Sequence, residues 1–242
     1  MLYSTRGIVL HYLKYSESSI IAKVYTELFG LQSYMVKGIR NPRARMKTGL
    51  FQPFTILELS VYHKEKSGLQ NLKEAHHAFP YQTIPFDIRK SSIMLFMDEV
   101  IYKSVKEEEP NKALYHFIED ACIRLDGMKE GYNHFHLHFL LRLTEFLGFI
   151  PQDNFSRETP IFDMQEGLFA STVPLHADYL LQDDSLLLHQ LLTVSPDDWR
   201  LLPISAHQRD VLLSKLLAYY RVHIPGFAVQ SHAVLHDVLR DA

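Results

Sequence analysis

Residues 54–63, FTILELSVYH, contain the clearest fold signal of the chain. Aliphatic side chains alternate there with polar or aromatic ones, in the order Leu57, Glu58, Leu59, Ser60, Val61 and Tyr62. A period of two predicts a β-strand that has one face in a core and the other in water.

Four other stretches of the first 80 residues are short and rich in β-branched and aromatic residues. They are TRGIVLHYL (5–13), SIIAKVYTE (19–27), LQSYMVKG (31–38) and LQNLKEAHH (69–77). Five short strands separated by turn signals predict a small barrel or sandwich. The buried face of LQSYMVKG is left open, because Tyr34 and Val36 compete with Leu31 and Met35 for the interior.

Beyond Pro80 the apolar residues recur at helical spacing. Helices are expected over residues 86–106, 111–126, 132–147, 184–192, 205–224 and 231–241. Asn111 and Ser205 stand where N-caps are expected. Residues 152–174 lose the helical period and suggest a small hairpin. We therefore expect an α+β fold with two domains, a barrel over residues 1–80 and a mainly helical domain over residues 81–242.

The chain has one cysteine, Cys122, among its 242 residues. A single cysteine excludes an internal disulfide and every zinc site built from several cysteines. No uninterrupted apolar run reaches the roughly 18 residues that a membrane-spanning helix needs. A cytoplasmic location without a membrane partner is the resulting expectation.

The positive charges gather near the N terminus. Residues 1–80 hold 11 Lys and Arg against 5 Asp and Glu, whereas residues 81–242 hold 14 against 23. The densest part is KGIRNPRARMK (37–47), here called the basic stretch, with the charges of Lys37, Arg40, Arg43, Arg45 and Lys47. Such asymmetry favours a polyanionic partner. Tyrosines interleaved with lysines in the expected strands would suit single-stranded nucleic acid.

Motifs for catalysis are absent from the sequence. The chain contains no phosphate-binding glycine loop, no nucleophile elbow and no HExxH sequence. His134, His136 and His138 alternate, but on a helix only the first and third share a face. Two imidazoles fall short of the usual four zinc ligands, so no metal site and no catalytic residue are expected.

Four stretches in order carry a resemblance to a known family. They are RGIVLHYLKYSESSIIAKVYTELFGLQSYMVKGIR (6–40), LFQPFTILELSVY (50–62), HFHLHFLLRLTEFLGFIPQ (134–152) and LLAYYRVHIPGF (216–227). Together they resemble the RecO family of bacterial recombination mediators. The resemblance implies an N-terminal five-stranded OB fold followed by a helical domain. It also implies a role in DNA repair and recombination, at the nucleoid and without enzymatic activity.

The implied partners are single- and double-stranded DNA, RecR, single-stranded-DNA-binding protein and, indirectly, RecA. The implied activity is sequence-independent DNA binding, annealing of complementary strands and assistance in loading RecA. On this interpretation the DNA-binding residues are Lys37, Arg40, Arg43, Arg45 and Lys47, extended by Arg6, Lys14, Lys23 and Tyr34. Phosphate contacts carry no base identity, which agrees with sequence-independent binding.

One departure from the family concerns its zinc. Many members carry four cysteines after the Leu-Gly-Phe-x-Pro stretch, whereas QDNFSRETPIFDMQEGLFASTV (152–173) has none. We expect no cofactor here and a hairpin held by the packing of Phe155, Ile161, Phe162, Leu168 and Phe169. Two alternatives stay open: an adaptor that docks acidic tails of partner proteins without binding DNA directly, and an RNA-binding OB protein.

Overall fold

A computed structural model describes residues 1–39, 46–65, 67–106, 108–195 and 198–240. The chain divides into two compact units, Met1–Gly127 and Met128–Ala242, called here the N-terminal and C-terminal units. The N-terminal unit includes two helices in addition to the strands. The domain boundary near residue 80 therefore stays a prediction from sequence.

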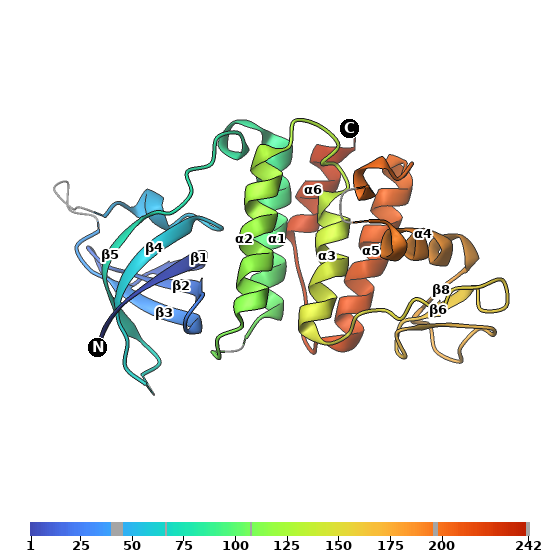
Figure 1. Ribbon diagram of the computed structural model, residues 1–242, viewed down its shortest axis with the longest axis horizontal. Helices are drawn as coiled ribbons and strands as arrows, with labels where there is room; N and C mark the ends of the chain where they lie inside the picture. The colour runs from blue at the N-terminus through green and yellow to red at the C-terminus, as the bar shows by residue number, and fades with distance from the viewer. Residues whose placement is uncertain (40–45, 66, 107, 196–197, 241–242) are drawn as a thin grey trace. The chain divides into compact units, whose positions relative to one another are not determined.

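Five strands of the N-terminal unit close into a barrel (Figure 1). They are β1 (Leu2–Lys14), β2 (Ile20–Thr26), β3 (Gly30–Val36), β4 (Ile56–Tyr62) and β5 (Gln70–His77). The order around the barrel is β1-β2-β3-β5-β4, and β1 pairs with both β2 and β4. The β3–β5 pair is parallel and the other pairs are antiparallel. The barrel is OB-like, so the α+β fold class is confirmed.

The barrel interior answers the question of strand faces. Leu57, Leu59 and Val61 lie inside, as the alternation in β4 predicts. In β3, Tyr34 and Val36 are fully buried in the same core, whereas Met35 is buried but is not part of that core. Long apolar side chains thus fill the barrel, as small closed barrels require.

Two antiparallel helices complete the N-terminal unit: α1 (Ile88–Ser104) and α2 (Lys112–Gly127). Asp87 caps α1 by accepting from the backbone N–H groups of Arg89 and Lys90. Asn111 caps α2 by accepting from the N–H of Leu114 at 3.0 Å. Both caps satisfy N–H groups that lack a partner within the helix. Short 3-10 helices, η1 (Thr48–Phe51) and η2 (Ile84–Phe86), flank β4 and α1.

Asp126, at the end of α2, fixes the segment that leads from the barrel into α1. Its carboxylate accepts from the backbone N–H groups of Gln82, Thr83 and Ile84 at 2.8, 2.8 and 2.9 Å. The buried ammonium of Lys90 donates to the Asp126 carbonyl at 3.0 Å and to the Thr83 hydroxyl at 2.7 Å. Charge-assisted bonds of this kind are stronger than neutral ones.

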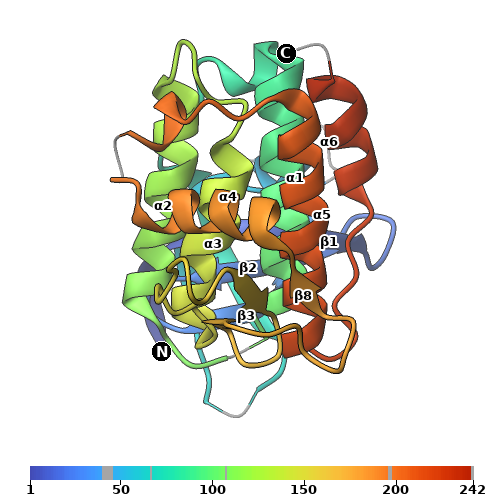
Figure 2. The same ribbon diagram turned by 90° about the vertical axis from the view of Figure 1, so that its right-hand side faces the viewer.

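The C-terminal unit packs helices beside a small sheet (Figure 2). Its helices are α3 (Phe135–Leu147), α4 (Gln182–Thr193), α5 (Ala206–His223) and α6 (Ser231–Leu239), with the 3-10 helix η3 (Trp199–Leu201). Strands β6 (Ile161–Asp163) and β7 (Leu168–Ala170) form the predicted hairpin, and β8 (Tyr179–Leu180) adds a third strand. Ser205 caps α5 in a reciprocal pair with Gln208.

Aromatic packing supports the cysteine-free hairpin. The ring of Phe169 contacts those of Phe155 and Phe162, with centroids 5.3 and 5.0 Å apart. Phe155 also stacks on His189 of α4 at 4.7 Å. Aromatic side chains thus pack the hairpin and join it to α4. None of the helices in the described part of the chain is long and apolar enough to cross a bilayer.

Candidate nucleic-acid interface

Exposed cations gather at one end of the barrel. Lys14 ends β1, and its register partner Ile20 pairs in turn with Val36, the residue before Lys37. Lys14 and Lys37 are both exposed. The N–H of Ile39 donates to the carbonyl of Ser18 at 2.9 Å, which fastens the start of the basic stretch beside the β1–β2 turn. This end of the barrel is called the basic end.

The structure describes the last two residues of the basic stretch, Met46 and Lys47. Lys47 is exposed and directly precedes η1, whose first turn is closed by the N–H of Leu50 donating to the Lys47 carbonyl at 3.0 Å. Arg40, Arg43 and Arg45 lie outside the described residues. Their predicted contacts with DNA stay predictions.

Lys23, in the middle of β2, lies against α1. Its Nζ is 5.6 Å from the ring centroid of Tyr102, and the Nζ of Lys103 is 6.0 Å from the same centroid. The ring of His11, the β1 partner of Lys23, lies 5.3 Å from that of Tyr102. Burial, and then the charge of Lys23, hold the pKa of His11 below its ordinary value. The sequence pattern identified Lys23 but gave no reason to connect it with Tyr102 and Lys103, because that contact is tertiary.

Arg6 is engaged within the N-terminal unit. Its guanidinium pairs with the Glu119 carboxylate of α2 at 3.2 Å, and the hydroxyl of Tyr115 donates to the same carboxylate at 3.1 Å. The side chain of Arg6 is nevertheless 55% exposed, whereas that of Glu119 is buried. A phosphate would therefore compete with an existing carboxylate partner for Arg6.

The expectation that Tyr34 offers a stacking surface is wrong for the folded barrel. Its ring is fully buried in the core formed by β1–β5, so neither face is open to a base. Tyr25 is buried as well and donates its hydroxyl to the carbonyl of Asn111. Tyr62, at the end of β4, is 45% exposed. The sequence of β3 did not show which of its faces is buried, and in the structure the ring of Tyr34 packs inside the barrel.

An apolar groove of about 560 Å³ lies between η1, the segment after β5 and α1. Pro53, Tyr81 and Leu95 line it. Gly49, two residues after Lys47, forms part of its wall. Phe86 and Ile88, at the start of α1, are 87% and 71% exposed. The groove thus continues from the last cation of the basic stretch.

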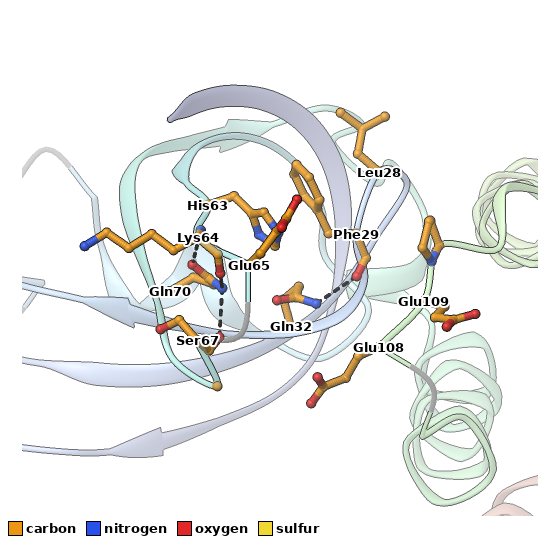
Figure 3. A pocket seen from close by; sticks show the side chains of 12 residues that line it. Leu28, Phe29, Gln32, His63, Lys64, Glu65, Ser67, Gln70, Glu108 and Glu109 are labelled. Carbon is orange, nitrogen blue, oxygen red and sulfur yellow. Dashed lines mark hydrogen bonds between the residues drawn. The ribbon is translucent and has the colours of Figure 1, made fainter.

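A second cavity, of about 570 Å³, has the opposite character (Figure 3). Three carboxylates line it, from Glu65, Glu108 and Glu109, and Lys64 extends away from them. The rings of Phe29 and His63 stack at 4.0 Å in its wall. An acidic wall repels phosphate, so this cavity lies outside any surface that would follow a nucleic-acid backbone.

The surroundings of His134, His136 and Cys122 are typical of structural side chains and not of reactive ones. Burial, and then Arg209, lower the pKa of His136 to about 3 and that of His134 to about 4. Burial raises the pKa of the Cys122 thiol, and a buried thiol without a thiolate form is unreactive. Within the described ranges, no three His, Cys, Asp or Glu side chains are grouped to hold a metal ion.

Comparison with known proteins gives matches over both units. The family model described as Recombination protein O N terminal matches residues 1–81, and the one described as Recombination protein O C terminal matches residues 85–232. A protein named DNA repair protein RecO from Bacteroides fragilis is 36% identical over 242 residues, which cover 100% of this chain and 99% of that protein. The protein of the same name from Flavobacterium psychrophilum is 38% identical over 229 residues, 94% of each chain.

Proposed function

This chain belongs to the RecO family, and on that premise we propose that it is a non-enzymatic mediator of DNA repair and recombination. It binds single- and double-stranded DNA without sequence preference and anneals complementary strands. It works with RecR to replace single-stranded-DNA-binding protein by RecA. It acts in the cytoplasm, at the nucleoid.

The observation that carries the DNA-binding part of the proposal is the basic end of an OB-like barrel. Lys14 and Lys37 are exposed there, and Lys47 is exposed where the basic stretch rejoins the barrel. Cations that follow a groove or rim attract the phosphate backbone and release its counterions. Arg40, Arg43 and Arg45 would add charges that can fork onto phosphates.

The same surface suits annealing. Lysine and arginine side chains that neutralise phosphates lower the repulsion between two strands. Contacts restricted to the backbone leave the base edges free to pair. The acidic cavity lined by Glu65, Glu108 and Glu109 would keep the strands on the opposite part of the barrel surface.

Fluorescence anisotropy with a labelled single-stranded oligonucleotide tests the proposal. If about four phosphates are neutralised, the slope of log affinity against log salt is about −2.8. The affinity then falls roughly 50-fold between 50 and 200 mM salt. Strand annealing, followed with a fluorophore and a quencher on complementary oligonucleotides, should show the same dependence on salt.

A charge-matched pair of variants locates the surface. The triple change Arg40→Ala, Arg43→Ala and Arg45→Ala should weaken binding to all sequences alike and flatten the salt slope. The control removes three exposed lysines of the same unit, Lys64, Lys73 and Lys112, and should retain the slope. If both triple variants bind equally well, the basic stretch is not the DNA-binding surface.

The two alternatives are decided by the same sample. An adaptor that only docks acidic tails would show no affinity of the purified chain for DNA at 50 mM salt. An RNA-binding protein would prefer RNA in competition with DNA of equal length and sequence.

A further inference from the structure

We propose that Lys23 and Lys103 form a second phosphate-binding site on the N-terminal unit. A strand held at the basic end would continue over the outer face of the barrel to the C-terminal end of α1. This inference rests on the proposed DNA binding and extends it from Lys23, which the sequence pattern indicates, to Lys103 of α1, which it does not.

Lys23 points outward from the barrel. Its neighbours in β2, Ala22 and Val24, are buried in the barrel core, and successive side chains of a strand face opposite ways. Lys103 lies in the last turn of α1. The two ammonium groups approach the ring of Tyr102 to 5.6 and 6.0 Å, so they can be no further apart than these two distances combined.

The ring of Tyr102 favours both cations through its quadrupole, but it carries no net charge to balance them. Among the described residues, the ion pairs of the N-terminal unit involve neither Lys23 nor Lys103. The partial negative charge at the end of α1 favours Lys103. This helix dipole does not explain why Lys23, a residue of β2, approaches the same ring.

Two converging cations with a neutral histidine beside them create a positive potential that an anion would relieve. His11 stays neutral there because burial, and then Lys23, disfavour its charged form. A phosphate that contacts both ammonium groups would supply a counter-charge. Lysine is suited to this as a point charge that needs no fixed hydrogen-bond geometry.

The position fits a continuous path. Lys23 is three residues from Ile20, whose register partner is Lys14 at the basic end. At about 3.3 Å per residue, the two sites are roughly 10 Å apart along the strand. The acidic cavity begins beyond the other end of β2, at Leu28 and Phe29. A DNA strand that crosses the middle of β2 would therefore pass from Lys14 to Lys23 and stop short of the carboxylates.

The test compares three double variants of the full chain. Lys23→Ala with Lys103→Ala should flatten the salt slope for single-stranded DNA by about 1.4, since each lost phosphate contact removes about 0.7. At 0.1 M salt this corresponds to roughly 25-fold weaker binding. Lys23→Arg with Lys103→Arg should restore the slope. The control, Lys73→Ala with Lys112→Ala, removes two exposed lysines and should bind as the unchanged chain does.

Thermal unfolding, followed by circular dichroism, checks that the variants fold. Wild-type affinity and slope in the folded alanine pair would overturn this inference while leaving the proposed function intact. Failure of the unchanged chain to bind DNA at 50 mM salt would instead remove the proposed function and this inference with it.

Discussion

Acidification should destabilise the C-terminal unit through His136. This side chain is only 1% exposed, and burial, Arg209 and His134 together lower its pKa to about 3. In the unfolded chain its pKa is about 6.5. Between these values the unfolded state binds a proton that the folded state refuses, so stability falls as the pH decreases below about 6.5.

The size of the effect follows from the separation of the two pKa values. At pH 5.0 the unfolded histidine is almost fully protonated, and the loss is about 2 kcal/mol, compared with almost nothing at pH 7.5. The figure at pH 5.0 changes little if the folded pKa lies anywhere below about 4. His134, with a pKa of about 4, acts in the same direction but is less deeply buried.

Urea denaturation followed by tryptophan fluorescence measures the loss. Trp199 is the single tryptophan and is buried in the same unit as His136, with its ring stacked on His138. Changing His136→Gln should reduce the loss in unfolding free energy between pH 7.5 and 5.0 by about 2 kcal/mol. The control His207→Gln, at an exposed position of α5, should leave the loss unchanged. An undiminished pH dependence in His136→Gln would refute the reasoning.

Three further predictions concern the N-terminal unit. Asp126→Ala should cost about 3 kcal/mol, because three backbone N–H groups lose a charged acceptor, whereas the exposed Asp120→Ala should cost little; thermal melting compares them. Tyr34→Leu should lower stability by about 1–3 kcal/mol through lost packing but leave the DNA affinity of the folded protein unchanged, and weaker binding in anisotropy would contradict the burial of the ring. Cys122 should resist a thiol reagent in native buffer and react in denaturant, and rapid native labelling would show that its burial is wrong.

Local patterns determined most of the barrel and the helices. The alternation in β4 predicted its buried face, and Asn111 and Ser205 marked helix starts that the structure confirms. These features depend on neighbouring residues, which the sequence shows directly. The strand β8 was not predicted, because a two-residue strand has no periodicity of its own and exists only through its pairing with β6.

The candidate interface was less predictable than the fold. The sequence shows which side chains carry a charge, but whether a side chain is exposed depends on contacts with residues far away in the chain. Exposed lysines at strand ends, such as Lys14 and Lys37, follow from turns and register. Tyr34 does not, because the choice of face in β3 depends on which side chain the closed barrel can bury. Arg6 likewise has a side chain that could bind a phosphate. Its guanidinium, however, already donates to Glu119, which is 113 residues away in the chain.

The meeting of Lys23 and Lys103 around Tyr102 illustrates the same limit more strongly. Each residue alone is an ordinary surface side chain of its element, and only the packing of α1 against β1 and β2 brings them together. Two ammonium groups that approach one ring repel each other, and the ring carries no net charge to balance them. Such an arrangement therefore points to an anionic ligand more strongly than any single cation in the sequence does. The change in salt slope of the alanine pair, Lys23→Ala with Lys103→Ala, reports how many phosphate contacts the two lysines make.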